Sequence, residues 1–284
     1  MELITKSATS APRLSVSTWS LHRALGRPAF YGAAEGEQIP VETHNQGTIA
    51  LLDLPARIAG AGIYTLEICH FHLPSRERSY LEELRGALES AGVQLFSLLV
   101  DDGDLTSAAH AARDLPWIEG WIATASALGA QRIRVIAGKA GPSAQTLEQS
   151  RRGLGALAQQ AGAHGIRLMT ENWHGLLARP QDVLTLLAQL DGQVGLCLDF
   201  GNWRGPTKYD DLAAIAPRAE SCHTKAHFTA PRELDRADYV RCLDLTRAAH
   251  FAGPYTLIYD GPGDDELEGL AIEQAIVRPY LTPA

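Results

Sequence analysis

Hydrophobic residues along the chain gather in eight short runs, and the segments between them carry apolar positions at helical spacing. The runs lie at residues 14–19, 64–69, 94–100, 132–137, 166–171, 194–199, 220–225 and 255–260. Helices are expected over about 104–128 and 143–164, where apolar residues form a stripe along one helix face. Eight strands that alternate with helices predict parallel βα units, and eight such units close into a (β/α)8 TIM barrel of the α/β class.

Length and composition favour a single domain over residues 1–284. A TIM barrel typically has about 250 residues, and this chain has 284, of which 45% are hydrophobic. No Pro- or Ser-rich linker divides it. The first connection, at about residues 20–47, is long and rich in Gly, Pro and Glu. Long loops in compact domains often cover a site, so we expect a lid here; a flexible insertion or a contact within a homo-oligomer is the alternative.

Charge and cysteine usage narrow the partners and the compartment. A net charge of −8 disfavours nucleic acid as the main partner, because affinity for the phosphate backbone comes largely from Lys and Arg. No segment approaches the ~20 apolar residues of a membrane span, and the first residues lack an export signal. The four cysteines form no CxxC pair, which indicates reduced thiols. Together these features predict a cytoplasmic protein.

Four of the runs end in residues that can bind a metal, namely Glu171, Asp199, His223 and Asp260. In a TIM barrel the carboxyl ends of the strands and the loops after them build the active site. Carboxylates with one imidazole make a mixed oxygen and nitrogen site, suited to Mn²⁺, Mg²⁺, Co²⁺ or Zn²⁺ with positions open for substrate oxygens. We therefore predict one divalent metal ion held by these four side chains, with solvated strand ends as the simpler alternative.

A metal in this place suits proton transfer next to a carbonyl. The ion would polarise the carbonyl and stabilise an enediolate when the neighbouring carbon loses a proton. A carboxylate on either side of the substrate could then take and return that proton. Glu171 and Asp260 are the candidate catalytic residues, and a role as ligand alone is the alternative for each.

Further residues near the strand ends are candidates for substrate binding. Lys225 follows His223 by two residues, so in an extended segment their side chains share a face; a salt bridge in the barrel mouth is the alternative. Trp19 ends the first run, where it would stack on a sugar or close a barrel layer. His70 follows the second run as a hydrogen-bonding candidate, with a polar Glu67 below it. His174 lies in the loop after the fifth run, where a surface histidine is the alternative.

At these positions the chain resembles the sugar phosphate isomerase/epimerase family of xylose isomerase-like barrels, over about residues 12–281. The resemblance rests on Glu171-Asn172, Asp199-Phe-Gly-Asn202, His223-Thr-Lys225 and Asp260-Gly261 at successive strand ends. It implies that Glu171, Asp199, His223 and Asp260 take the family's metal-ligand positions. It further implies that the first and the last of these form the acid/base pair of the epimerases.

The chain also departs from the family's pattern. Asn202, which we assign to substrate binding, stands where many sugar epimerases have His. The acid after the eighth strand is commonly Glu, and here it is the shorter Asp260, which puts its reach as a base in question. An Asp often follows the His-x-Lys motif, but here Ala226 does. Metal binding is therefore better supported than classical ketose epimerisation.

The favoured function is a metal-dependent sugar isomerase or epimerase that acts on a carbohydrate through an enediolate. The first alternative is a lyase or dehydratase that removes a β-substituent from a keto-sugar, inosose or keto-glycoside. A more remote one is a DNA repair enzyme like endonuclease IV, which would need further His and Asp ligands that this chain lacks around Asn202 and His223. The last is a metal- or sugar-binding protein without catalysis. Few basic residues follow the last strands, so we expect an unphosphorylated sugar.

Overall fold

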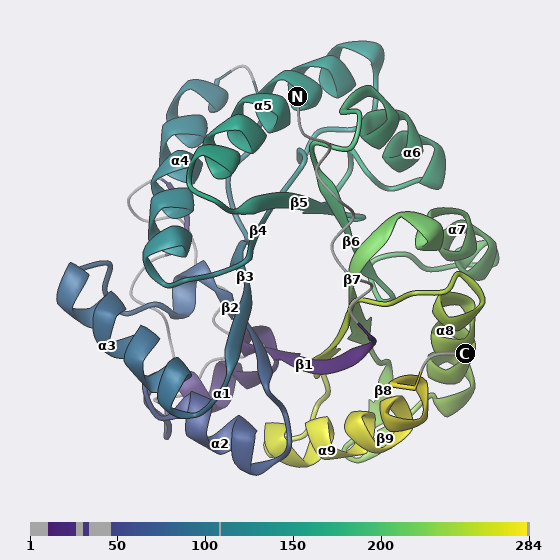
Figure 1. Cartoon of the computed structure of the whole chain (residues 1–284). Coiled ribbons are helices and arrows are strands. Elements are labelled where there is room, and N and C mark those ends of the chain that lie inside the picture. The colour runs from purple at the N-terminus through teal and green to yellow at the C-terminus, as the bar shows by residue number, and fades with distance from the viewer. Residues whose placement is uncertain (1–10, 27–30, 34–46, 108, 283–284) are drawn as a thin grey trace.

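A computed structural model describes residues 11–26, 31–33, 47–107 and 109–282, and these form one closed barrel of parallel strands ringed by helices (Figure 1). Around the barrel the strands follow the order β1-β10-β7-β6-β5-β4-β3-β2. Their bounds are β1 (Arg13–Ser17), β2 (Thr65–Cys69), β3 (Gln94–Val100), β4 (Arg132–Val135), β5 (Arg167–Glu171), β6 (Gly195–Asp199), β7 (Ala219–Lys225) and β10 (Pro254–Ile258). Each predicted run overlaps one of these strands, so the predicted single-domain TIM barrel is confirmed.

Helices cover the outside of the barrel (Figure 1). They are α1 (His22–Leu25), α2 (Leu54–Gly60), α3 (Arg78–Ser90), α4 (Ala111–Ala127), α5 (Ala144–Ala163), α6 (Pro180–Gln189), α7 (Lys208–Ile215), α8 (Arg236–Ala248) and α9 (Glu266–Val277). The helix expected over 143–164 is α5, which begins after Ser143 because the Ser143 hydroxyl caps the N–H of Thr146. The helix expected from about residue 104 begins only at Ala111. Asp104 instead shapes a loop, in which its N–H donates to Asp114.

Apolar packing between the strands and the surrounding helices holds this arrangement together. Leucines on the outer faces of the strands, such as Leu66 and Leu196, are fully buried against helix residues such as Leu84, Leu154 and Leu186. Burial of such side chains is the main favourable term in folding. The barrel interior, in contrast, is largely polar.

Polar contacts cross the barrel interior at both ends. Glu67 on β2 contacts His223 on β7, although β1 and β10 separate these two strands in the sheet. At the amino ends of the strands, Arg167 of β5 donates to Glu220 of β7 over 2.7 and 2.9 Å. Charged groups inside a protein are stable only when they are paired, so both pairs fix the strands relative to each other.

Three further predictions concern the chain as a whole. Residues 27–30 and 34–46 of the first connection, which we expect to form a lid, lie outside the described residues. Where the chain is described again, Thr48 N–H donates to the carbonyl of Ala24. All four cysteines are free and buried, in agreement with reduced thiols. In the described part of the chain, no helix has the length and apolar character that crossing a membrane requires.

The structure adds a small element that the sequence patterns did not predict. A two-stranded antiparallel hairpin, β8 (Phe228–Ala230) and β9 (Glu233–Leu234), follows β7 before α8 begins. Arg232 adopts a left-handed conformation at its turn, with a φ of 68°. The hairpin therefore extends the carboxyl end of β7, next to the candidate site.

Candidate functional site

A pocket of about 390 Å³ lies at the carboxyl ends of the barrel strands. It is lined by residues at the ends of the strands or just after them, namely Trp19, Leu99, Asp101, Arg134, Glu171, Trp173, Asp199, Asn202, His223, Lys225 and Ile258. The pocket thus brings together most of the residues that the sequence placed in a site. Its position is the one at which TIM barrels carry their active sites.

Three of the four predicted metal ligands converge in this pocket. Nδ1 of His223 lies 3.6 Å from Oε2 of Glu171 and 3.7 Å from Oδ2 of Asp199. All three residues are buried, each with 4% of its surface exposed. Atoms that share one ion at bond lengths of about 2.1 Å lie about 3 to 3.5 Å apart. In the described part of the chain, the group whose ligand atoms all lie within 4.8 Å of one another is Glu171, Cys197 and His223. A common ion with Asp199 as a ligand therefore requires its carboxylate to move closer to Glu171.

Asp199 owes its orientation to the backbone around it. Its N–H donates to Oδ1 of Asn172 over 2.7 Å, and Nδ2 of Asn172 donates to its carbonyl over 3.0 Å. One carboxylate oxygen, Oδ1, accepts from the N–H groups of Gly201 and Asn202, which leaves Oδ2 to face His223. Burial, followed by the negative charge of Glu171, raises the pKa of Asp199 to about 6.

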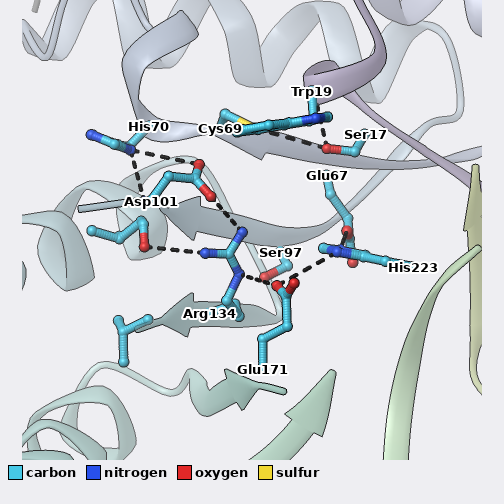
Figure 2. A network of polar contacts seen from close by, with 12 residues as sticks. Ser17, Trp19, Glu67, Cys69, His70, Ser97, Asp101, Arg134, Glu171 and His223 are labelled. Atoms are coloured by element: carbon cyan, nitrogen blue, oxygen red, sulfur yellow. Dashed lines mark hydrogen bonds and ion pairs between the residues drawn. The ribbon is translucent and has the colours of Figure 1, made fainter. Parts of the chain in front are cut away.

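His223 is oriented by a carboxylate on the far side of its ring. Its Nε2 lies 2.7 Å from Oε2 of Glu67, which is fully buried (Figure 2). Nδ1 is therefore directed towards Glu171 and Asp199. Metal-binding histidines commonly have such a carboxylate partner. Burial disfavours the charged ring, but Cys197, Glu67 and Glu171 outweigh it and raise the pKa of His223. Cys197 also lies within this group, because one ligand atom each of Glu171, Cys197 and His223 fall within 4.8 Å of one another.

A buried arginine completes the polar network and was missed from the sequence. Arg134 lies between Asp101 and Glu171 (Figure 2), with Nη2 2.6 Å from Oδ1 of Asp101 and Nε 3.0 Å from Oε2 of Glu171. Burial alone would raise the pKa of Asp101, but Arg134 and His70 lower it below its usual value. A signal for Arg134 did exist: in Arg132-Ile-Arg134-Val the alternation puts both arginines on one face of a buried strand.

Asn202 and Trp19, two predicted substrate-binding residues, line the pocket as expected. Nδ2 of Asn202 donates to Oε1 of Glu171 over 2.7 Å, so Asn202 positions this carboxylate. Trp19 stands edge-on to Trp173, with 6.4 Å between the ring centres. Because β1 lies opposite β5 in the barrel, Trp19 faces Glu171 across the pocket.

Lys225 lines the pocket too, and it pairs with the fourth predicted ligand. Nζ of Lys225 lies 2.6 Å from Oδ2 of Asp260, whose side chain is 41% exposed. The structure does not bring Asp260 to the other three predicted ligands, because β10 ends at Ile258, the residue that pairs with Lys225 in the sheet. The strand predicted to reach residue 260 therefore stops two residues earlier. At this point the pocket is lined by Ile258.

The two predicted histidines take other positions. His70 is fully buried, with Nε2 2.5 Å from the carbonyl of Tyr31 and Nδ1 accepting from the N–H of Asp101. These contacts with the backbone make it a support for Asp101. His174 stacks on Trp173 at 4.1 Å, and Trp173 is the one that lines the pocket. Burial, followed by the charges of Lys139 and Arg134, lowers the pKa of His174 to about 4.

Comparison with known proteins identifies the family of the chain. Among curated proteins, no sequence matches it significantly. Three similar solved structures have between 14% and 16% sequence identity, and this likeness concerns the fold. One is a xylose isomerase-like TIM barrel protein from Mycobacterium smegmatis in complex with magnesium, with a TM-score of 0.68, 16% identity and coverage of 98% of this chain and 99% of that one.

The second is the D-allulose 3-epimerase from Methylomonas sp., with a TM-score of 0.69, 14% identity and coverage of 97% of this chain and 100% of that one. The third is the probable 3-DHS dehydratase AsbF from Bacillus anthracis, with a TM-score of 0.67, 15% identity and coverage of 93% and 98%. The sequence profile described as xylose isomerase-like TIM barrel matches residues 55–257. This match spans well over half of the chain, which therefore belongs to the xylose isomerase-like TIM barrel family.

Proposed function

We propose that this protein is a metal-dependent enzyme that isomerises a sugar or keto-sugar by proton transfer next to its carbonyl. The observation that carries the proposal is the approach of Nδ1 of His223 to both Oε2 of Glu171 and Oδ2 of Asp199 within one buried pocket. Sugar epimerases and a dehydratase among the proteins of like fold add support to a carbohydrate substrate.

The donor atoms fit one divalent ion with oxygen and nitrogen ligands. Two carboxylate oxygens and one imidazole nitrogen suit Mn²⁺, Mg²⁺, Co²⁺ or Zn²⁺. Burial raises the pKa of Cys197, which favours the neutral thiol over the thiolate that softer ions select. We therefore assign Glu171, Asp199 and His223 as ligands and Cys197 as a neighbour. A bound ion would polarise the substrate carbonyl and stabilise negative charge on its oxygen.

Glu171 is the proposed general base. Its Oε1 is held by Asn202 and its Oε2 by Arg134, so the carboxylate has a fixed orientation in the pocket. A base held close to the acidified C–H can remove its proton and return it to the neighbouring carbon. Together with transfer of the hydroxyl proton from one substrate oxygen to the other, this converts an aldose into a ketose. The charge of Arg134 offsets the negative charge that would otherwise gather around Glu171.

The wall opposite Glu171 favours reactions that need a base on one face of the substrate only. Trp19 and Ile258 line the pocket on the side of β1 and β10. Inversion of a carbon by two bases would need an acid on this side, and Asp260 is turned towards Lys225 instead. This observation favours isomerisation with a single base. It equally favours the second candidate, β-elimination, in which Lys225 would protonate the leaving oxygen.

The test combines metal analysis with isotope exchange. We expect the purified protein to hold one divalent ion, and His223→Ala to lose it while the fold is retained. In deuterated water the metal-loaded enzyme should place deuterium on a substrate carbon, and Glu171→Gln should lower this exchange by about 10²–10⁴-fold. The matched control is Glu83→Gln, an exposed position on α3.

The products separate the two candidate reactions. A labelled isomer supports isomerisation, and an unsaturated ketone, detected by its ultraviolet absorption, supports elimination. A protein with full exchange in the ion-loaded Glu171→Gln variant would contradict the assignment of the base. Retention of the ion by His223→Ala would contradict the metal site.

A further inference from the structure

A second and larger pocket adjoins the metal-site pocket. It has an open volume of about 1160 Å³ and is formed by the loop after β6, the first turns of α7 and α8, and the segment after β7. Among its lining residues are Trp203, Arg204, Tyr209 and His227. We call this space the outer groove. Lys225 lines both the outer groove and the metal-site pocket, so the two spaces adjoin at this side chain.

We propose that the outer groove binds a second sugar unit, so that the substrate is a glycoside or disaccharide whose reactive unit lies in the metal-site pocket. This inference rests on the function proposed above and names its substrate class. The outer groove is the larger of the two spaces, so a unit of the substrate that the metal-site pocket does not hold would find room there.

The ion pair of Lys225 and Asp260 stands at the junction of the two spaces. Asp260 lines the outer groove, and its Oδ2 is 2.6 Å from Nζ of Lys225. Nζ of Lys225 also lies 5.7 Å from the ring centre of Trp19, which belongs to the inner pocket. A glycosidic oxygen that passes from one pocket to the other would therefore meet an ammonium donor and a carboxylate acceptor.

The charge balance of the outer groove favours a neutral ligand. Its lining includes the cations Arg204, Lys208 and Lys225 and an equal number of carboxylates, Asp235, Asp238 and Asp260. Nζ of Lys208 lies 2.6 and 2.8 Å from the two oxygens of Asp238, and the hydroxyl of Tyr209 donates to the same carboxylate over 2.9 Å. A phosphate group would find two of these cations, Lys208 and Lys225, already neutralised. Sugar hydroxyls both donate and accept, so they match a wall of mixed donors and acceptors.

Aromatic side chains give the groove a rigid wall. Nε1 of Trp203 donates to the carbonyl of Leu177 over 3.1 Å, which fixes the indole. The guanidinium of Arg241 lies 3.7 Å from the ring centre of Tyr209 and holds that ring in place. Trp203 is 6% exposed and Arg241 covers one face of Tyr209, so these rings keep the wall of the groove rigid and leave the polar groups on it to contact a ligand.

The experiment compares ligands that share one keto unit. Binding of fructose, lactulose, palatinose and fructose 6-phosphate to the metal-loaded protein is measured by calorimetry, which needs no turnover. Lactulose and palatinose carry a second sugar unit on fructose. We expect at least one of them to bind about tenfold or more tightly than fructose, as a few additional hydrogen bonds would provide.

A variant of the groove tests where the second unit binds. Arg204 and His227 are exposed, so their replacement in Arg204→Ala/His227→Ala should not disturb the core. We expect the preference for the disaccharide over fructose to fall by about tenfold in this variant. The matched control is Arg57→Ala/His164→Ala, at exposed positions on other elements, which should keep the preference.

The outcomes separate the two proposals. Equal binding of fructose and both disaccharides, tighter binding of fructose 6-phosphate, or a preference that survives in the groove variant would overturn the second-unit site. Such results leave the metal and isotope tests of the proposed function untouched. Failure of all four sugars to bind would overturn this inference as well, and absence of the metal from the protein would overturn the proposed function itself.

Discussion

Glu67 on β2 and His223 on β7 contact each other through the barrel interior, with 2.7 Å between Oε2 and Nε2 (Figure 2). The contact fixes which nitrogen of His223 faces the pocket. It also continues a line of buried groups of alternating charge that runs through Asp101, Arg134, Glu171, His223 and Glu67. The geometry of the proposed metal site therefore depends on residues from strands on opposite sides of the barrel.

Removal of the charge on Glu67 should weaken metal binding although Glu67 is no ligand. Glu67→Gln keeps the shape of the side chain but loses the carboxylate that orients His223. Loss of such a partner typically lowers metal affinity by about 10–100-fold, and titration calorimetry would measure it. Glu83→Gln serves as the control. An unchanged affinity in Glu67→Gln would mean that the Glu67 contact is structural only.

Metal affinity should fall steeply as the solution is acidified. In the folded protein the pKa of Asp199 is raised to about 6, so a proton competes for this ligand at a higher pH than for an ordinary Asp. Below pH 6 the affinity should drop by about tenfold per pH unit for each proton that the ion displaces. Titrations between pH 5 and 8 check this. Affinity that stays flat across this range would exclude Asp199 and His223 as ligands.

Loss of Arg134 should destabilise the protein more than any surface arginine. Arg134→Met leaves the carboxylates of Asp101 and Glu171 buried without their cation. Removal of one partner from a buried ion pair costs about 3–5 kcal/mol, which thermal or denaturant unfolding would detect. Arg78→Met, whose pair with Glu82 is exposed, is the control and should unfold like the wild type. Equal stability of the two variants would contradict a structural role for the Arg134 network.

Asp260 and Asp199 should differ sharply when each is replaced by Asn. Asp260 lies outside the cluster and pairs with Lys225, so Asp260→Asn should leave the metal affinity unchanged. Asp199→Asn removes an oxygen that faces His223 and should lower metal occupancy strongly. Elemental analysis of both proteins checks the contrast. If the two variants lose the ion alike, Asp260 is a ligand after all.

The fold could be predicted from the sequence because the strands and helices of a barrel give a regular pattern of hydrophobic residues. Each strand keeps apolar residues on the face that packs against the helices, and helical segments separate the strands, so the pattern repeats along the chain. The candidate ligands followed from one rule about strand ends. The rule predicted that Glu171, Asp199 and His223 lie together, and all three line the pocket. Their role as ligands stays a prediction.

The end of β10 and the partners of Glu67 and Arg134 could not be predicted, because they depend on contacts between strands that are distant in the sequence. The end of β10 is set by its pairing with β7, in which Ile258 meets Lys225, and the residues after it leave the extended conformation. Asp260 therefore departs from the face on which strand periodicity placed it. Glu67 and Arg134 gain their partners across the barrel and between strands, so their roles depend on the order of strands in space.

The amide of Asn172 occupies the place of a neighbouring strand at the end of β6, since it both accepts from and donates to the backbone of Asp199. The N–H groups of Gly201 and Asn202 then donate to the side chain of Asp199. Amide protons in loops usually exchange with solvent through small local fluctuations. Here exchange requires the whole corner to open, so these protons should be among the slowest of any loop in the barrel. A substrate then meets a preformed edge at β6.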